Sequence, residues 1–171
     1  MRAWRRELGT LLGSPPAAPA VELTVERDAI ALRAGAAGAT RIPLDAAPLV
    51  LPLADGSVAA LTLWLLGEHG VAATRAALLA EAARVCAPDG ILVAVDHNRP
   101  RRRGAALLAL ATAPHPPGAT PASRWRRLAH PTAREIHAAG FTIERLRLAA
   151  GERVQVVWAR RARLRTAPTT A

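Results

Sequence analysis

The chain has no lysine and only one cysteine among its 171 residues. A lone Cys86 excludes an internal disulfide and a thiolate metal cluster, and it fits a reducing cytoplasm, where we expect the protein to be located. No segment reaches the roughly 18 consecutive apolar residues that a membrane-spanning helix needs. A P-loop, a Gly-x-Ser-x-Gly turn and paired carboxylates for hydrolysis are also missing, and the five histidines show no metal-ligand spacing.

Arginine supplies all 23 basic residues, and alanine is abundant. This bias indicates first a GC-rich coding habit, since both residues have GC-rich codons. Hydrophobic residues make up 51% and charged residues 21%, which predicts a folded chain of one domain. The net charge of +10 is concentrated in residues 99–171, which carry 15 arginines and three acidic residues. Such a surface suits nucleic acid, an anionic membrane or an acidic partner, and is equally consistent with a solvated basic face.

The first third of the chain predicts short strands. A helix over Ala3–Leu12 and a Pro-rich link are expected in residues 1–20. The alternation of apolar and polar residues over 21–26 predicts a half-buried strand. The next apolar segment, 29–34, suits either the second strand of a hairpin or a short helix. A further strand and a Pro-punctuated extended loop are expected over 40–57.

A strand, a helix and a strand follow. Residues 58–66 are apolar without alternation, as in a strand buried on both faces of a parallel sheet. Apolar residues at helical spacing then predict a helix that includes Cys86. Pro88 ends this helix, and Gly90 is expected to supply the reversal into a strand over 91–95. Such a unit predicts a parallel α/β sheet.

The last third completes an α/β layer. A helix is expected over 103–113 and a loop over 114–123. The next helix has Pro131 in its first turn and Gly140 just past its end, the favoured places for these residues. Strands on both sides of the short turn 150–152 predict an antiparallel hairpin. We therefore expect one α/β domain over residues 21–161, closed by an antiparallel strand pair, and a flexible basic tail over 162–171.

Residues 40–161 resemble the second half of a class I S-adenosylmethionine-dependent methyltransferase, specifically the methyltransferase type 11-like domain. The resemblance is carried by "LDAAPLVLPLADGSVAALTLWLL", "ALLAEAARVCAPDGILVAVDHNRP" and "HPTAREIHAAGFTIERLRL", in the family's order and spacing. It implies a Rossmann-like methyltransferase sheet, S-adenosyl-L-methionine as cofactor and methyl transfer as the activity.

The resemblance also implies site residues. Asp45 and Ala46 match the acidic position that hydrogen-bonds the adenine amine. Leu65, Leu66 and Gly67 match the segment beside the methionine part of the cofactor. His69 lies where many members of the family have a histidine near the methyl-transfer centre, and a neutral imidazole there would accept a proton from the attacking nucleophile. As alternatives, Asp45 suits a turn cap and His69 an ordinary loop position.

A polar run follows the predicted strand over residues 91–95. Asp96, His97 and Asn98 lie at the edge where open α/β sheets bind ligands, so we expect them to contact the substrate. Turn formation before Pro100 is the alternative explanation. The acceptor is not specified by the sequence, although the apolar helix after this run hints at a small hydrophobic or lipid-like molecule.

The first part of the chain departs from the family. The glycine-rich turn after the first strand and the acidic residue about 20 positions later are not found, so the front is truncated or divergent. One interpretation is a divergent methyltransferase, its cofactor site completed by a partner chain. Another is a catalytically inactive methyltransferase-like subunit that binds or scaffolds.

A third hypothesis is a basic nucleic-acid-binding module. Its phosphate contacts would come from clustered arginines, and Trp125 between two of them would stack on a base. The arginines concerned are Arg99, Arg101, Arg102, Arg103, Arg124, Arg126 and Arg127.

Overall fold

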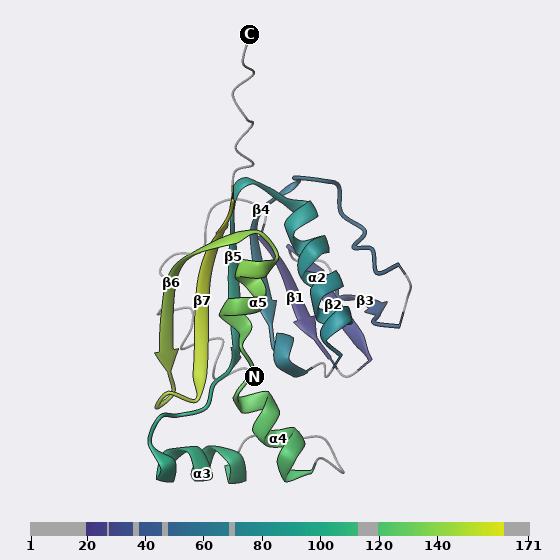
Figure 1. The fold of residues 1–171 in the computed structure, drawn as a ribbon. Helices are drawn as coiled ribbons and strands as arrows, with labels where there is room; N and C mark the ends of the chain where they lie inside the picture. Colours follow the sequence, from purple (N-terminus) through teal and green to yellow (C-terminus); the bar gives the residue numbers. More distant parts are fainter. Residues whose placement is uncertain are drawn as a thin grey trace.

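A computed structural model describes residues 20–26, 28–35, 38–45, 48–68, 71–112 and 120–162. Their strands form one seven-stranded sheet in the order β3-β2-β1-β4-β5-β7-β6 (Figure 1). The expected α/β fold is confirmed. The predicted helix over Ala3–Leu12 and the tail over 163–171 lie outside the described residues.

Three strands form an antiparallel meander at one end of the sheet. They are β1 (Ala20–Val25), β2 (Ala29–Ala34) and β3 (Thr40–Pro43). Of the two expectations for residues 29–34 the strand is correct, since these residues pair antiparallel with β1 across the short link 26–28. No helix separates these strands in the described residues, and this is where the chain departs from a doubly wound α/β sheet.

The central unit has β4 (Val58–Trp64), α2 (Ala72–Val85) and β5 (Cys86–His97). As expected, β4 is parallel to both its neighbours, β1 and β5. The helix ends at Val85, so the expectation of Cys86 inside it is wrong, and Cys86 is the first residue of β5.

The turn that follows Cys86 uses its residues differently from the prediction. Asp89, not Gly90, takes the left-handed backbone conformation, with φ at 65°. Gly90 is needed for space, since a Cβ there would lie 2.7 Å from Sγ of Cys86 and 2.8 Å from the carbonyl oxygen of Ala87. The turn therefore contains the expected glycine, but Asp89 takes the left-handed conformation and Gly90 provides the space.

The last third contains α3 (Arg103–Thr112), α4 (Pro121–Leu128), α5 (Thr132–Ala138) and the antiparallel hairpin of β6 (Phe141–Ala149) and β7 (Val154–Arg161). The hairpin, α3 and α5 are confirmed. The loop expected over 114–123 is wrong at its end, because Pro121 begins α4. Proline is favoured at the first position of a helix, where its missing N–H is not needed.

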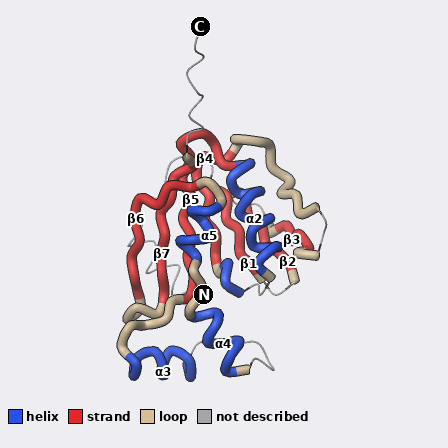
Figure 2. The backbone as a smooth tube through the Cα atoms, in the orientation of Figure 1, coloured by secondary structure: helices blue, strands red, loops and turns tan. Residues whose placement is uncertain are grey.

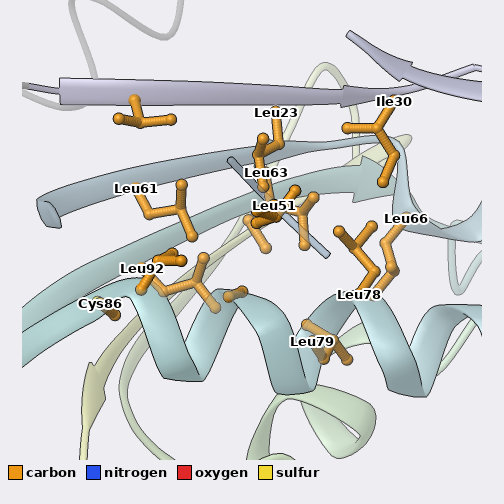
Figure 3. Close-up of a cluster of buried hydrophobic side chains, with 14 of the residues drawn as sticks. Leu23, Ile30, Leu51, Leu61, Leu63, Leu66, Leu78, Leu79, Cys86 and Leu92 are labelled. Atoms are coloured by element: carbon orange, nitrogen blue, oxygen red, sulfur yellow. The ribbon is translucent and has the colours of Figure 1, made fainter. Parts of the chain in front are cut away.

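The main core lies between the sheet and the helices α2 and α5, which cover the same face (Figures 1 and 2). Leucines from the strands meet leucines from α2, among them Leu23, Leu61, Leu63, Leu78 and Leu79, all nearly inaccessible to solvent (Figure 3). Since strand side chains alternate between faces, the neighbouring positions form a second cluster on the other face. It consists of Trp64, Val95, Val154 and Val156.

Candidate functional site

The carboxyl ends of β4 and β5 meet at one edge of the sheet. Directly after β4, Leu65 has φ at 60°, a conformation that a leucine rarely adopts. Its N–H donates to the carbonyl oxygen of Val95 at 2.8 Å, which holds the strained residue against β5. Backbone strain of this kind is concentrated at functional sites, which makes this edge a candidate site.

Asp96, near the end of β5, is the centre of a buried polar network. Its Oδ2 accepts hydrogen bonds from the N–H of Gly67 and from Oγ1 of Thr132, both at 2.8 Å. Its Oδ1 accepts from the N–H of His97, also at 2.8 Å. Burial raises the pKa of Asp96, and the hydrogen bond from Thr132, the nearby His130 and the N–H of Gly67 counteract part of this increase.

Gln155 of β7 extends the network toward α5. Its Nε2 donates to the carbonyl oxygens of His97 at 2.9 Å and His130 at 3.2 Å, and to Oγ1 of Thr132 at 3.2 Å. The His130 ring lies over Gly67, where a Cβ would be 2.9 Å from Cγ of the ring. The space beside Gly67 is therefore filled by the protein itself.

An ion pair borders the network on its helical side. Nε and Nη2 of Arg75 in α2 donate to the two carboxylate oxygens of Glu135 in α5, at 3.0 and 2.8 Å. Nε2 of His130 lies 3.4 Å from Oε2 of Glu135. Burial by itself raises the pKa of Glu135, but the hydrogen bonds from Arg75 and the nearby His130 bring the pKa below its usual value.

A second feature of the same sheet edge is an open groove of about 740 Å³. The start of β2, the end of β3 and the start of α2 form it. Asp45 lines it, as do Asp28, Arg41, Leu44, Val71 and Thr74. Nη2 of Arg41 lies 2.6 Å from Oε2 of Glu26 and 3.5 Å from Oδ1 of Asp28, so the guanidinium is held at the groove by two carboxylates.

The sequence-predicted site residues are only partly brought together. Gly67 was expected to lie beside the cofactor and Asp96 to contact the substrate, but the two residues are hydrogen-bonded to each other. Asp45 lies in the groove instead. Nδ2 of Asn98 donates to the carbonyl oxygen of Glu152 at 2.7 Å, so its amide contacts the turn between β6 and β7. Predicted residues His69 and Ala46 lie outside the described residues.

Sequence reasoning missed five members of the network. Thr132, Glu135 and Arg75 are polar residues on helices, without a local signal that distinguishes them. The sequence has no feature that distinguishes His130 from the other four histidines. Gln155 offered a signal, because it is the one uncharged polar residue in the apolar strand over 154–158. A buried strand tolerates such a residue when its amide is fully hydrogen-bonded.

The two features differ in what they can bind. Asp96 is 1% exposed and accepts hydrogen bonds from Gly67 and Thr132, so the network around it leaves no open space for a cofactor. The groove is open and combines carboxylates, one guanidinium and apolar side chains. Carboxylates accept hydrogen bonds from hydroxyl and amino groups, and apolar side chains pack against an aromatic ring, so the groove suits a ligand that carries both kinds of group.

No family model matches the chain, and no curated protein matches it in sequence. The chain aligns with solved structures. For a SAM-dependent methyltransferase of Aquifex aeolicus the identity is 19% and the TM-score 0.45, over 71% of this chain and 55% of that chain. For the cyclase SpnF the identity is 16% and the TM-score 0.47, over 66% of this chain and 52% of that chain.

A third match is a chain of the Haloferax volcanii complex that contains the Trm112 methyltransferase activator, at 14% identity and a TM-score of 0.44. It covers 66% of this chain and 57% of that one, so the chain spans about half the length of the three structures. In the described ranges no helix is long and apolar enough to cross a membrane.

Proposed function

We propose that the chain is an S-adenosylmethionine-dependent methyltransferase-like protein that binds its cofactor in the groove between the start of β2, the end of β3 and the start of α2. The observation that carries this proposal is the open groove itself, with Asp45 in its wall. It lies at the edge where open α/β sheets bind ligands. The resemblance gives Asp45 the role of acceptor for the adenine amine.

Five of the lining residues have a role in this proposal. Asp28 and Asp45 would accept hydrogen bonds from the ribose hydroxyls and the adenine amine. Arg41, already held by carboxylates, is a donor for ring nitrogens. Val71 and Leu44 cover the adenine face. When bound, the cofactor would supply an electrophilic methyl group, and His69 stays the predicted proton acceptor.

Isothermal titration calorimetry of the 171-residue chain with S-adenosylmethionine, and separately with S-adenosylhomocysteine, tests cofactor binding. We expect saturable binding. Asp45→Asn should weaken it about tenfold, the value of one hydrogen bond to a charged group. Glu144→Gln is the matched control, because it removes an exposed carboxylate on β6, at the opposite end of the sheet from β3, and should leave binding unchanged.

A second candidate function is that of a catalytically inactive methyltransferase-like subunit. The closed network around Asp96 favours it, because the groups expected to face a substrate are bonded to each other. In this case the folded chain shows no binding heat with S-adenosylmethionine or S-adenosylhomocysteine up to millimolar concentration. Binding that appears only in the presence of a partner chain would instead support a cofactor site completed by that partner.

A further inference from the structure

Helix α3 buries two alanines and exposes two leucines. Ala106 and Ala109, one turn apart, are 5% and 1% exposed. Leu107 and Leu108, on the other side of the helix, are 64% and 55% exposed. Folding alone favours the reverse orientation, since a buried leucine removes far more apolar surface from water than a buried alanine.

Two adjacent exposed leucines on a short helix are unusual, because amphipathic helices normally turn such residues toward the core. The helix lies at the end of the molecule beyond the sheet, next to α4 (Figures 1 and 2). Leu107 and Leu108 each keep more than half of their surface accessible to solvent. Apolar surface is therefore exposed on this terminal helix.

Basic residues precede the exposed leucines in the chain. Just before and at the start of α3 the chain has four exposed arginines: Arg99, Arg101, Arg102 and Arg103. Glu152 is an acidic residue that contacts this segment: its Oε2 accepts a hydrogen bond from the backbone N–H of Arg101 at 3.0 Å. We call these four arginines and the two leucines the α3 surface.

We propose that the α3 surface docks onto an anionic lipid bilayer. Its chemistry matches an interfacial helix, in which leucines enter the headgroup boundary while arginines contact anionic headgroups. The charge complementarity comes from four arginines against one carboxylate. Helix α3 would lie flat on the surface, as its short length requires.

A nucleic acid explains these observations less well. Phosphate contacts would use the arginines, but they leave the exposed leucines without a role. The guanidinium of Arg99 lies over the Trp125 ring, 5.1 Å from its centroid. One face of this ring is therefore already covered, which weakens the hypothesis that Trp125 stacks on a base.

Flotation with lipid vesicles tests the proposal. Full-length protein is mixed with vesicles of phosphatidylcholine alone, or of phosphatidylcholine and phosphatidylglycerol in equal parts. We expect binding to the anionic vesicles and little to the neutral ones. Replacing Leu107→Ser and Leu108→Ser together should reduce the affinity at least tenfold, since each leucine buries several methylene-sized groups.

A matched control uses the exposed leucines of β6. Leu146 and Leu148 are 48% and 37% exposed and also alternate with arginines. Changing both to serine should leave vesicle binding unchanged. Because all four leucines are exposed, neither double variant removes core packing, and circular dichroism verifies that both are folded.

The arginines supply the second arm of the experiment. The triple variant Arg101→Gln, Arg102→Gln and Arg103→Gln should lose about fivefold per arginine on anionic vesicles, and salt should mask this difference. Asp45→Asn should bind vesicles like the wild type, so failure of the cofactor proposal leaves this test intact.

Three results would overturn the proposal. The first is equal binding to neutral and anionic vesicles, or to neither. The second is wild-type vesicle affinity in the Leu107 and Leu108 variant. The third is binding to a random single-stranded oligonucleotide that needs the arginines but not the leucines, together with no vesicle binding, which would assign the surface to nucleic acid.

Discussion

Thr132→Val removes one oxygen atom from the centre of the buried network. Thr132 is fully buried, and valine has nearly the same shape, so the packing of α5 against the sheet is kept. The hydroxyl donates to Asp96 at 2.8 Å and accepts from Gln155 at 3.2 Å. Both partners stay buried in the variant, each with one hydrogen bond fewer.

The expected loss follows from these two bonds. A hydrogen bond to a charged group contributes about 1.5–3 kcal/mol and a neutral one about 0.5–1.5 kcal/mol. We expect the free energy of unfolding to fall by about 3 kcal/mol. For a chain of this size such a loss lowers the Tm by about 6–12 °C.

Urea unfolding followed by far-UV circular dichroism measures the loss. Thr142→Val on β6 is the control, because Thr142 is exposed, and its unfolding free energy should change by less than about 0.5 kcal/mol. If Thr132→Val is no less stable than this control, the network around Asp96 does not stabilise the fold and the reasoning is wrong.

Two further predictions concern α2 and the turn after it. Gly90→Ala should destabilise the fold by about 1–3 kcal/mol, since the new Cβ would overlap Cys86 and the backbone of Ala87. A thiol reagent should then modify the buried Cys86 faster, and an unchanged modification rate would contradict this prediction. Arg75→Gln should cost about 2 kcal/mol at neutral pH. Because the pKa of Glu135 is lowered in the fold, this stability is present above the usual glutamate pKa and is lost as the pH falls through the lowered value. The unfolding free energies of wild type and variant should therefore converge in acid. A difference between them that stays constant with pH would refute this prediction.

Elements with a strong local pattern were predictable from the sequence. Alternation marked β1, a continuous apolar run marked β4, and leucines at helical spacing marked α2. Local patterns failed where neighbours decide the outcome. Cys86 belongs to β5 because the strand pairs with β4 as far back as Val58, and periodicity carries no information about this pairing.

The site was predictable only in single residues. Gly67 and Asp96 were both singled out, but for different ligands, and their hydrogen bond exists because β4 and β5 end side by side. Gln155 reaches this edge through the antiparallel register of β7 on β5, which pairs it with Asp96. Such registers depend on contacts far apart in the chain. The role of His69 remains a prediction.

The meander of β1, β2 and β3 has a consequence for how the protein folds. Its strands pair across the short links 26–28 and 35–39, so little entropy is lost in closing them. Pairing of β5 with β7 must instead bring Asp96 to Gln155 across α3, α4, α5 and β6. Local contacts form faster than distant ones. We therefore expect the groove end of the sheet to assemble first, and the strand register around Asp96 to limit the folding rate.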